Sequence, residues 1–167
     1  MITFVTGGAR SGKSSFALSS ASGIQGRRAY IATAQALDVE MKDRIGKHKQ
    51  ERSSAWDTFE EPQAISKLVR EIGGKYDVIL LDCLTLWLSN LMMDNADIPA
   101  ALDSFIAAVK ECTAELFIVS NEVGMGIVPD NEMARMFRDH AGTMNRSAAE
   151  AADRVYLLCS GIPVRIK

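Results

Sequence analysis

The sequence predicts a three-layer α/β domain around a mainly parallel sheet, and three observations lead to this fold class. Short apolar runs rich in Val, Ile and Leu recur along the chain, and most are continuous, as in strands buried on both faces. Amphipathic helical patterns lie between these runs. The first run leads directly into a glycine-rich segment typical of a phosphate-binding loop. Strands that alternate with helices in this way form parallel sheets with right-handed crossovers.

Strands are expected where the apolar runs are strongest. Each run has the length of an ordinary strand and is bounded by polar or glycine-containing segments. The expected strands are Ile2–Thr6, Ala29–Thr33, Val78–Asp82, Leu116–Ser120 and Val155–Cys159.

Two helices between these strands carry clear apolar stripes, Ile65–Ile72 and Leu102–Val109. Pro62 and Pro99 stand where a first helical position would be, which suits proline because that position needs no N–H donor. Gly73 and the glycine after it would end the first of these helices in a left-handed conformation.

The last part of the chain departs from the alternating pattern. A long helix is expected from about residue 131 to 151, followed by the strand Val155–Cys159. Only residues 160–162 then separate this strand from the final segment Pro163–Lys167. A connection this short cannot make a parallel crossover, so the sequence predicts an antiparallel hairpin at the edge of the sheet.

Composition sets the class of protein. A chain of 167 residues is large enough for one domain with a sizeable core, so residues 1–167 are expected to form a single domain. The net charge is -2 and the basic residues are dispersed except around positions 42–52, which argues against a nucleic-acid partner. Three widely spaced cysteines, no leader and no apolar run of membrane length predict a cytoplasmic protein without a membrane span.

The segment after the first strand fits the phosphate-loop pattern G-x-x-x-x-G-K-[ST]. Its glycines allow backbone N–H groups to surround a phosphate, the following helix adds its positive end, and Lys13 adds a mobile charge. Ser14 is expected to contact Mg²⁺. A glycine-rich turn that binds nothing is the alternative, and the strand-loop-helix context argues against it. The loop consists of Gly7, Gly8, Ala9, Arg10, Ser11, Gly12, Lys13 and Ser14.

Asp82 ends an apolar strand, as expected of a second nucleotide motif whose carboxylate reaches Mg²⁺ through water. Apolar strands that end in Asp are common, so this interpretation depends on the phosphate loop. With the loop present, Ser14 and Asp82 predict a Mg²⁺ site.

One of the two histidines, His48, lies in the segment 38–52, which has helical spacing of apolar residues. Arg44 and Arg52 flank it at four-residue intervals, so two guanidinium groups can lie beside the imidazole. Cationic neighbours favour a neutral imidazole, which can act as a nucleophile or a base. From the residues alone, a solvated surface histidine is the stronger interpretation. His140, on the long helix, is interpreted as a packing or surface residue.

Two further segments follow strands at the edge where open α/β sheets bind ligands. They are Thr33–Gln35 and Asn121–Pro129, and the second contains two glycines that permit close backbone approach. For both, a binding role and an ordinary strand-to-helix connection remain open.

Together these motifs resemble the family of bifunctional adenosylcobinamide kinases and adenosylcobinamide-phosphate guanylyltransferases of cobalamin biosynthesis. The string Asn121–Pro129 is the most specific, because a general phosphate-loop protein has no need of it. The matching segments, in the family's order and spacing, are Val5–Ser14, Tyr30–Thr33, Glu40–Met41, Arg44–His48, Leu81–Thr85, Asn121–Pro129, Phe137–Asp139 and Ser160–Gly161.

The resemblance implies a P-loop NTPase fold similar to the RecA core, a homotrimer and two reactions. ATP or GTP phosphorylates adenosylcobinamide; GTP then donates GMP to adenosylcobinamide phosphate through a covalent GMP-histidine, a role that falls to His48. Small-molecule substrates and Mg²⁺ are thus expected, with no nucleic acid. The implied nucleotide contacts are residues 7–14, Ile31, Ala32, Thr33, Lys49, Gln50, Glu51, Arg52, Glu60 and Asp82.

Two alternatives to the function implied by the resemblance remain open. One is a P-loop small-molecule kinase without a covalent intermediate, in which His48 is incidental. The other is a nucleotide-gated switch or assembly ATPase that works through a partner. His140 and Arg146 depart from the family pattern, and these departures put corrinoid specificity in doubt rather than the transfer step.

Overall fold

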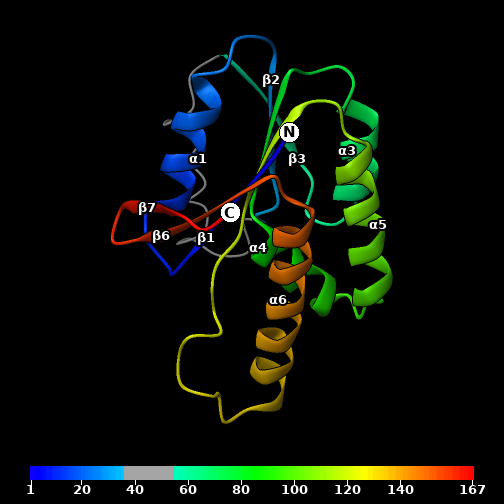
Figure 1. Ribbon diagram of the computed structural model, residues 1–167. Coiled ribbons are helices and arrows are strands. Elements are labelled where there is room, and N and C mark those ends of the chain that lie inside the picture. The colour runs from blue at the N-terminus through cyan, green and yellow to red at the C-terminus, as the bar shows by residue number, and fades with distance from the viewer. Residues whose placement is uncertain (36–54) are drawn as a thin grey trace.

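The computed structural model describes residues 1–35 and 55–167. The helix expected over 38–52 lies outside these ranges. Within them the strands form one sheet of order β3-β2-β4-β5-β1-β6-β7 (Figure 1). Neighbouring strands pair in parallel except for β6 and β7, which are antiparallel. The strands are β1 Ile2–Gly7, β2 Arg28–Ala32, β3 Trp56–Glu60, β4 Val78–Asp82, β5 Glu115–Val119, β6 Arg154–Cys159 and β7 Ile162–Arg165.

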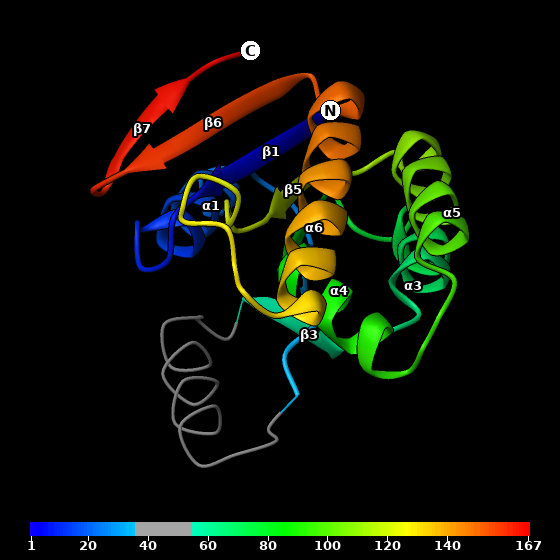
Figure 2. The same ribbon diagram turned by 90° about the horizontal axis from the view of Figure 1, so that it is seen from below.

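The helices of the described chain cover the two faces of the sheet unequally. One helix, α1, packs on one face, and four helices pack on the other (Figure 2). This arrangement is the predicted three-layer α/β fold. The helices are α1 Lys13–Ser22, α3 Ile65–Ile72, α4 Leu84–Met93, α5 Ile98–Glu111 and α6 Glu132–Ala151. No helix in the described ranges is long and apolar enough to cross a bilayer.

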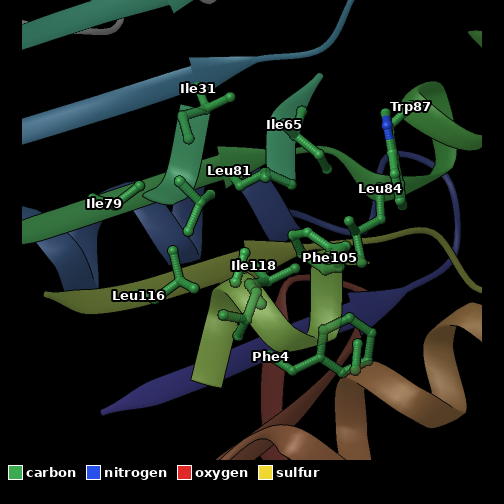
Figure 3. Packing of buried hydrophobic residues seen from close by; sticks show 14 of the residues in the cluster. Phe4, Ile31, Ile65, Ile79, Leu81, Leu84, Trp87, Phe105, Leu116 and Ile118 are labelled. Atoms are coloured by element: carbon green, nitrogen blue, oxygen red, sulfur yellow. The ribbon is translucent and has the colours of Figure 1, made fainter. Parts of the chain in front are cut away.

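The larger core lies between the sheet and the four-helix face. Successive strand residues point to opposite faces, so Ile79 and Leu81 enter this core while Val78 and Leu80 face α1. Trp87 of α4 packs against Phe105 of α5, with ring centroids 5.3 Å apart. Figure 3 shows these side chains meeting those of the central strands. Continuous apolar strands are therefore required, because both faces of the sheet are covered.

The helix starts were predicted with mixed success. Asp97 caps α5 by accepting a hydrogen bond from the Ala100 N–H at 3.0 Å, and Pro99 lies in the first turn, one position later than expected. The expectation for Pro62 was wrong, since α3 begins at Ile65. Glu61 Oε1 accepts from the N–H of Gln63 and of Ala64 instead, so the proline belongs to a turn that precedes the helix.

The left-handed stop expected after α3 is also wrong. Gly73 has a right-handed φ of -58°, and the glycine after it is not among the residues with positive φ. A Cβ at Gly73 would lie 2.7 Å from the Val69 carbonyl oxygen and 3.1 Å from the Cys112 sulfur. Glycine is needed there for close packing rather than for backbone conformation.

The C-terminal hairpin is confirmed. The strands β6 and β7 pair antiparallel at the sheet edge, and Leu158 faces Pro163 across the pair. Ser160 and Gly161 make the turn with positive φ values of 50° and 84°. Two elements were not predicted, β3 and α4; β3 is an edge strand with mainly polar, exposed residues, and α4 is apolar around most of its circumference.

Candidate functional site

The predicted phosphate loop connects β1 to α1 at the carboxyl edge of the sheet. Lys13, the first residue of α1, is only 6% exposed, and its Nζ donates to the Gly8 carbonyl and to Ser11 Oγ. Arg10 and Gly12 have positive φ values of 55° and 91°, which bend the backbone around the ammonium group. The loop therefore holds a buried cation beside its own N–H groups, as a triphosphate site requires.

The hairpin β6–β7 supports this loop from one side. A Cβ at Gly7 would lie 2.4 Å from the Leu158 carbonyl oxygen, so the first glycine is required by the neighbouring strand. At the hairpin turn, the Gly161 N–H donates to the Ser11 carbonyl at 3.0 Å. This bond satisfies an outward carbonyl of the loop and fixes the loop against the sheet.

Asp82 ends β4 on the same edge. Its Oδ2 accepts a hydrogen bond from the Tyr30 hydroxyl at 2.7 Å, and Tyr30 is buried in β2. The next residue, Cys83, follows a cis peptide bond and is held by Thr33, whose Oγ1 accepts from the Cys83 N–H and donates to the Cys83 carbonyl, both at 2.8 Å. The ends of β2 and β4 are thus locked together.

The register of the sheet places several of the predicted residues side by side on neighbouring strands, near the carboxyl edge. Glu60 pairs with Ala32, Ala32 with Asp82, Asp82 with Val119 and Val119 with Val5, two residues before the loop. Ile31 and Thr33 are buried on either side of half-buried Ala32. The carboxylates and the phosphate loop therefore share one edge of the sheet.

Ser14 and Asp82 are suitable Mg²⁺ partners. Ser14 lies in the first turn of α1, and both residues are half-buried. The bond from Tyr30 engages one Asp82 oxygen and leaves Oδ1 for a cation or its water. In residues 1–35 and 55–167 no group of three His, Cys, Asp or Glu side chains could hold a metal.

The segment after β5 is anchored by a buried polar network. The Thr85 hydroxyl accepts from both the backbone N–H and the side-chain amide of Asn121, each at 3.0 Å. Asn145 of α6 donates to the Asn121 carbonyl at 3.0 Å and accepts from Ser120 Oγ at 2.6 Å. The Glu122 N–H then donates to the Gly7 carbonyl at 2.9 Å, which joins this segment to the phosphate loop.

Sequence reasoning missed the residues that support the site. Tyr30 and Thr85 lie in segments that the family resemblance includes, but no local pattern indicates what their hydroxyls bind. Asn145 is fourteen positions into a helix, and only the fold brings it to β5. The predicted residues His48 and Lys49–Arg52 lie outside the part of the chain that the structure describes. His140, interpreted as packing or surface, is half-buried on α6.

The three cysteines are free thiols, as composition predicted. Burial raises the pKa of the Cys83 thiol, and the Asp82 carboxylate beside it acts in the same direction. Desolvation likewise raises the pKa of the Cys112 thiol. Both thiols are thus kept in the protonated, unreactive form, which argues for packing roles.

The loop, the strand-end carboxylate and the strand order define a nucleotide-binding protein with a RecA-like P-loop fold. The crystal structure of flagellar accessory protein FlaH from Methanocaldococcus jannaschii has a similar fold, with a TM-score of 0.56 and 14% sequence identity. That similarity covers 99% of this chain and 77% of the other.

Sequence comparison gives the family. The family model for cobinamide kinase / cobinamide phosphate guanyltransferase matches residues 3–166. The chain is 42% identical over 182 residues to the bifunctional adenosylcobalamin biosynthesis protein CobU of Escherichia coli (strain K12), covering 100% of both chains. It is also 42% identical over 173 residues to CobP of Pseudomonas aeruginosa, covering 100% of this chain and 98% of that protein. The chain belongs to the cobinamide kinase / cobinamide phosphate guanyltransferase family and is a P-loop transferase of cobalamin biosynthesis.

Proposed function

We propose that this enzyme catalyses two consecutive reactions on a corrinoid. In the first, ATP or GTP phosphorylates the aminopropanol hydroxyl of adenosylcobinamide. In the second, GTP transfers GMP to the resulting phosphate, which gives adenosylcobinamide-GDP and pyrophosphate. The observation that carries the proposal is the buried Lys13 inside a loop of residues 7–14, on the same sheet edge as Asp82, in a chain of this family.

The phosphate loop would serve both reactions. Lys13 and the loop N–H groups would neutralise charge on the triphosphate, and neutralisation is the main requirement of phosphoryl transfer. Ser14 and Asp82 would hold Mg²⁺, which supplies further neutralisation on the phosphate oxygens when it is bound. Tyr30 would keep the Asp82 carboxylate in one orientation through its 2.7 Å hydrogen bond.

His48 would be the nucleophile of the second reaction, with a nitrogen that attacks the α-phosphorus of GTP and forms a covalent GMP-histidine. Lys49–Arg52, Glu60 and Ile31–Thr33 would contribute nucleotide contacts. Two-step transfer through an enzyme nucleophile replaces one difficult displacement by two easier ones. We also propose a homotrimer in the cytoplasm, which light scattering on the purified protein and cell fractionation would test.

Labelling with α-³²P GTP tests the covalent step. The wild-type protein should take up label that is stable in base and lost in acid, as expected of a phosphoramidate. His48→Ala should take up none, whereas His140→Ala, the matched substitution at the other histidine, should label normally. An unlabelled wild-type protein with intact kinase activity would favour the plain P-loop kinase, and partner-dependent hydrolysis without a small-molecule product would favour the switch ATPase.

A further inference from the structure

The backbone of Glu122 lies directly beside the phosphate loop. It follows β5, the strand between β4, which carries Asp82, and β1, which carries the loop. Its backbone N–H donates to the Gly7 carbonyl at 2.9 Å, so its backbone touches the first residue of the loop. The residue therefore brings a carboxylate to the edge of the sheet that is expected to bind a triphosphate.

The backbone that carries Glu122 is fixed by neighbouring elements. Asn121, the preceding residue, has its N–H, its side-chain amide and its carbonyl bonded to Thr85 of α4 and Asn145 of α6. Thr85, Asn145 and Ser120 are all buried, and a satisfied buried network of this kind holds one geometry. The backbone of Glu122 is therefore placed by α4 and α6, through Asn121, and by the phosphate loop.

The side chain of Glu122 is itself restrained. Its Oε1 accepts from the Gly124 N–H at 2.6 Å, and its Oε2 makes no hydrogen bond within the described residues. The side chain is half-buried, so a substrate hydroxyl can reach the second oxygen. By comparison, the oxygen of Asp82 that Tyr30 leaves free is assigned to the cation, and Glu60 lies on the far edge strand of the sheet.

We propose that Glu122 is the general base of the kinase reaction, an inference that rests on the proposed function. The acceptor hydroxyl attacks the γ-phosphorus, an oxygen-phosphorus bond forms, and the bond from that phosphorus to the β,γ-bridging oxygen breaks. The nucleoside diphosphate leaves with the electron pair of the broken bond. The hydroxyl proton passes to Glu122 and then to solvent.

The second reaction does not need this base. Its acceptor is a phosphate monoester whose attacking oxygen already carries negative charge, and its donor is the nucleotide held on the histidine. Glu122 therefore serves one of the two reactions, whereas the phosphate loop serves both. Loss of the kinase reaction alone would therefore indicate a catalytic role for Glu122, whereas a structural role would affect both reactions.

The test is Glu122→Gln, which keeps an oxygen for the Gly124 N–H but cannot take up a proton. We expect kcat for phosphorylation of adenosylcobinamide to fall by about 10²-fold or more. Three other quantities should stay within about threefold of wild type, because none of them needs Glu122 to take up a proton. They are nucleotide affinity, label uptake from α-³²P GTP and transfer of GMP to adenosylcobinamide phosphate. Glu132→Gln, the same substitution at an exposed position of α6, is the matched control and should leave both reactions unchanged.

Two outcomes would overturn the inference while leaving the proposed function intact. One is a Glu122→Gln enzyme that phosphorylates adenosylcobinamide at the wild-type rate. The other is an equal loss of both reactions, which would indicate a structural role. A wild-type enzyme that carries out neither reaction would overturn the proposed function itself, and this inference with it.

Discussion

Two loops leave neighbouring parallel strands at the same edge of the sheet, and they are held in place by different means. The phosphate loop after β1 is shaped largely by its own residues, through glycines with unusual φ values and bonds from Lys13 to Gly8 and Ser11. The segment after β5 is held by side chains from α4 and α6. Beyond this anchor it extends away from the body of the protein (Figure 1), and Ile127 is 97% exposed.

The difference shows which kind of site a sequence can reveal. A loop whose geometry is encoded by its own residues has a recognisable spacing, and so the phosphate loop could be predicted. The segment after β5 depends on distant helices, so its own residues left its role open and only the family resemblance pointed to it. We expect the two regions to respond differently to substitution, and four changes test this, from the largest effect to the smallest.

The largest effect is expected from Lys13→Ala. This change removes the buried cation of the phosphate loop, and removing one preorganised charge or donor from a transition-state site costs about 10²- to 10³-fold in rate. Both reactions should be affected, because both use a triphosphate. Rates of each reaction measure the effect, with exposed Lys67→Ala as the control. A variant that loses only one reaction would contradict a shared role for the loop.

Gly7→Ala tests whether the phosphate loop is shaped by its own residues alone or also by the neighbouring strand β6. The new methyl group would meet the Leu158 carbonyl oxygen at 2.4 Å, and Gly7 has a φ of 149°. We expect the free energy of unfolding to fall by about 2–3 kcal/mol, as for a strained and overpacked site. Gly8→Ala is the control, since a Cβ there meets nothing within 4 Å. Equal stability of the two variants in urea denaturation would show that β6 does not restrict the loop.

Asn145→Leu tests the anchor of the β5 segment. The change removes the donor to the Asn121 carbonyl and leaves Ser120 without its acceptor, which should cost about 1–3 kcal/mol of stability. If Glu122 acts as proposed, the kinase rate should fall more than the guanylyl transfer rate. Urea denaturation and the two rates measure this. A uniform fall in both rates would argue that the network supports the whole edge rather than Glu122.

The smallest effect is expected next to that anchor, at the exposed pair Arg146 and Glu150. Their charged atoms are 3.9 Å apart, and both side chains are 72% exposed. A double-mutant cycle with alanine should give a coupling of at most about 0.5 kcal/mol, because solvent screens such pairs. A coupling well above this value would mean that the outer face of α6 contributes to holding the segment.

Much of the fold could be predicted because most of its strands are buried on both faces, and such strands appear in the sequence as continuous apolar runs. The strand β3 was missed because its residues are mainly exposed and it lies at the sheet edge. The helix α4 was missed because apolar side chains surround it and hide the helical period. Gly73 was misinterpreted because close packing and left-handed backbone both require glycine, and sequence does not distinguish the two.

The candidate site divides in the same way. Lys13, Asp82 and the loop glycines follow from short patterns with a known chemical purpose. The contacts from Tyr30 to Asp82 and from Asn145 to Asn121 join residues 52 and 24 positions apart, and only the folded sheet brings them together. Positioning residues of this kind have ordinary local sequences, so structure is needed to find them.

The central claim is that one edge of the sheet carries a loop used by both reactions and a carboxylate used by one. The most direct measurement compares kinase and guanylyl transfer rates in Lys13→Ala and Glu122→Gln, each assayed with its own corrinoid substrate. The account predicts that Lys13→Ala loses both reactions and that Glu122→Gln loses the kinase reaction alone. Two variants that lose both reactions in the same proportion would contradict it.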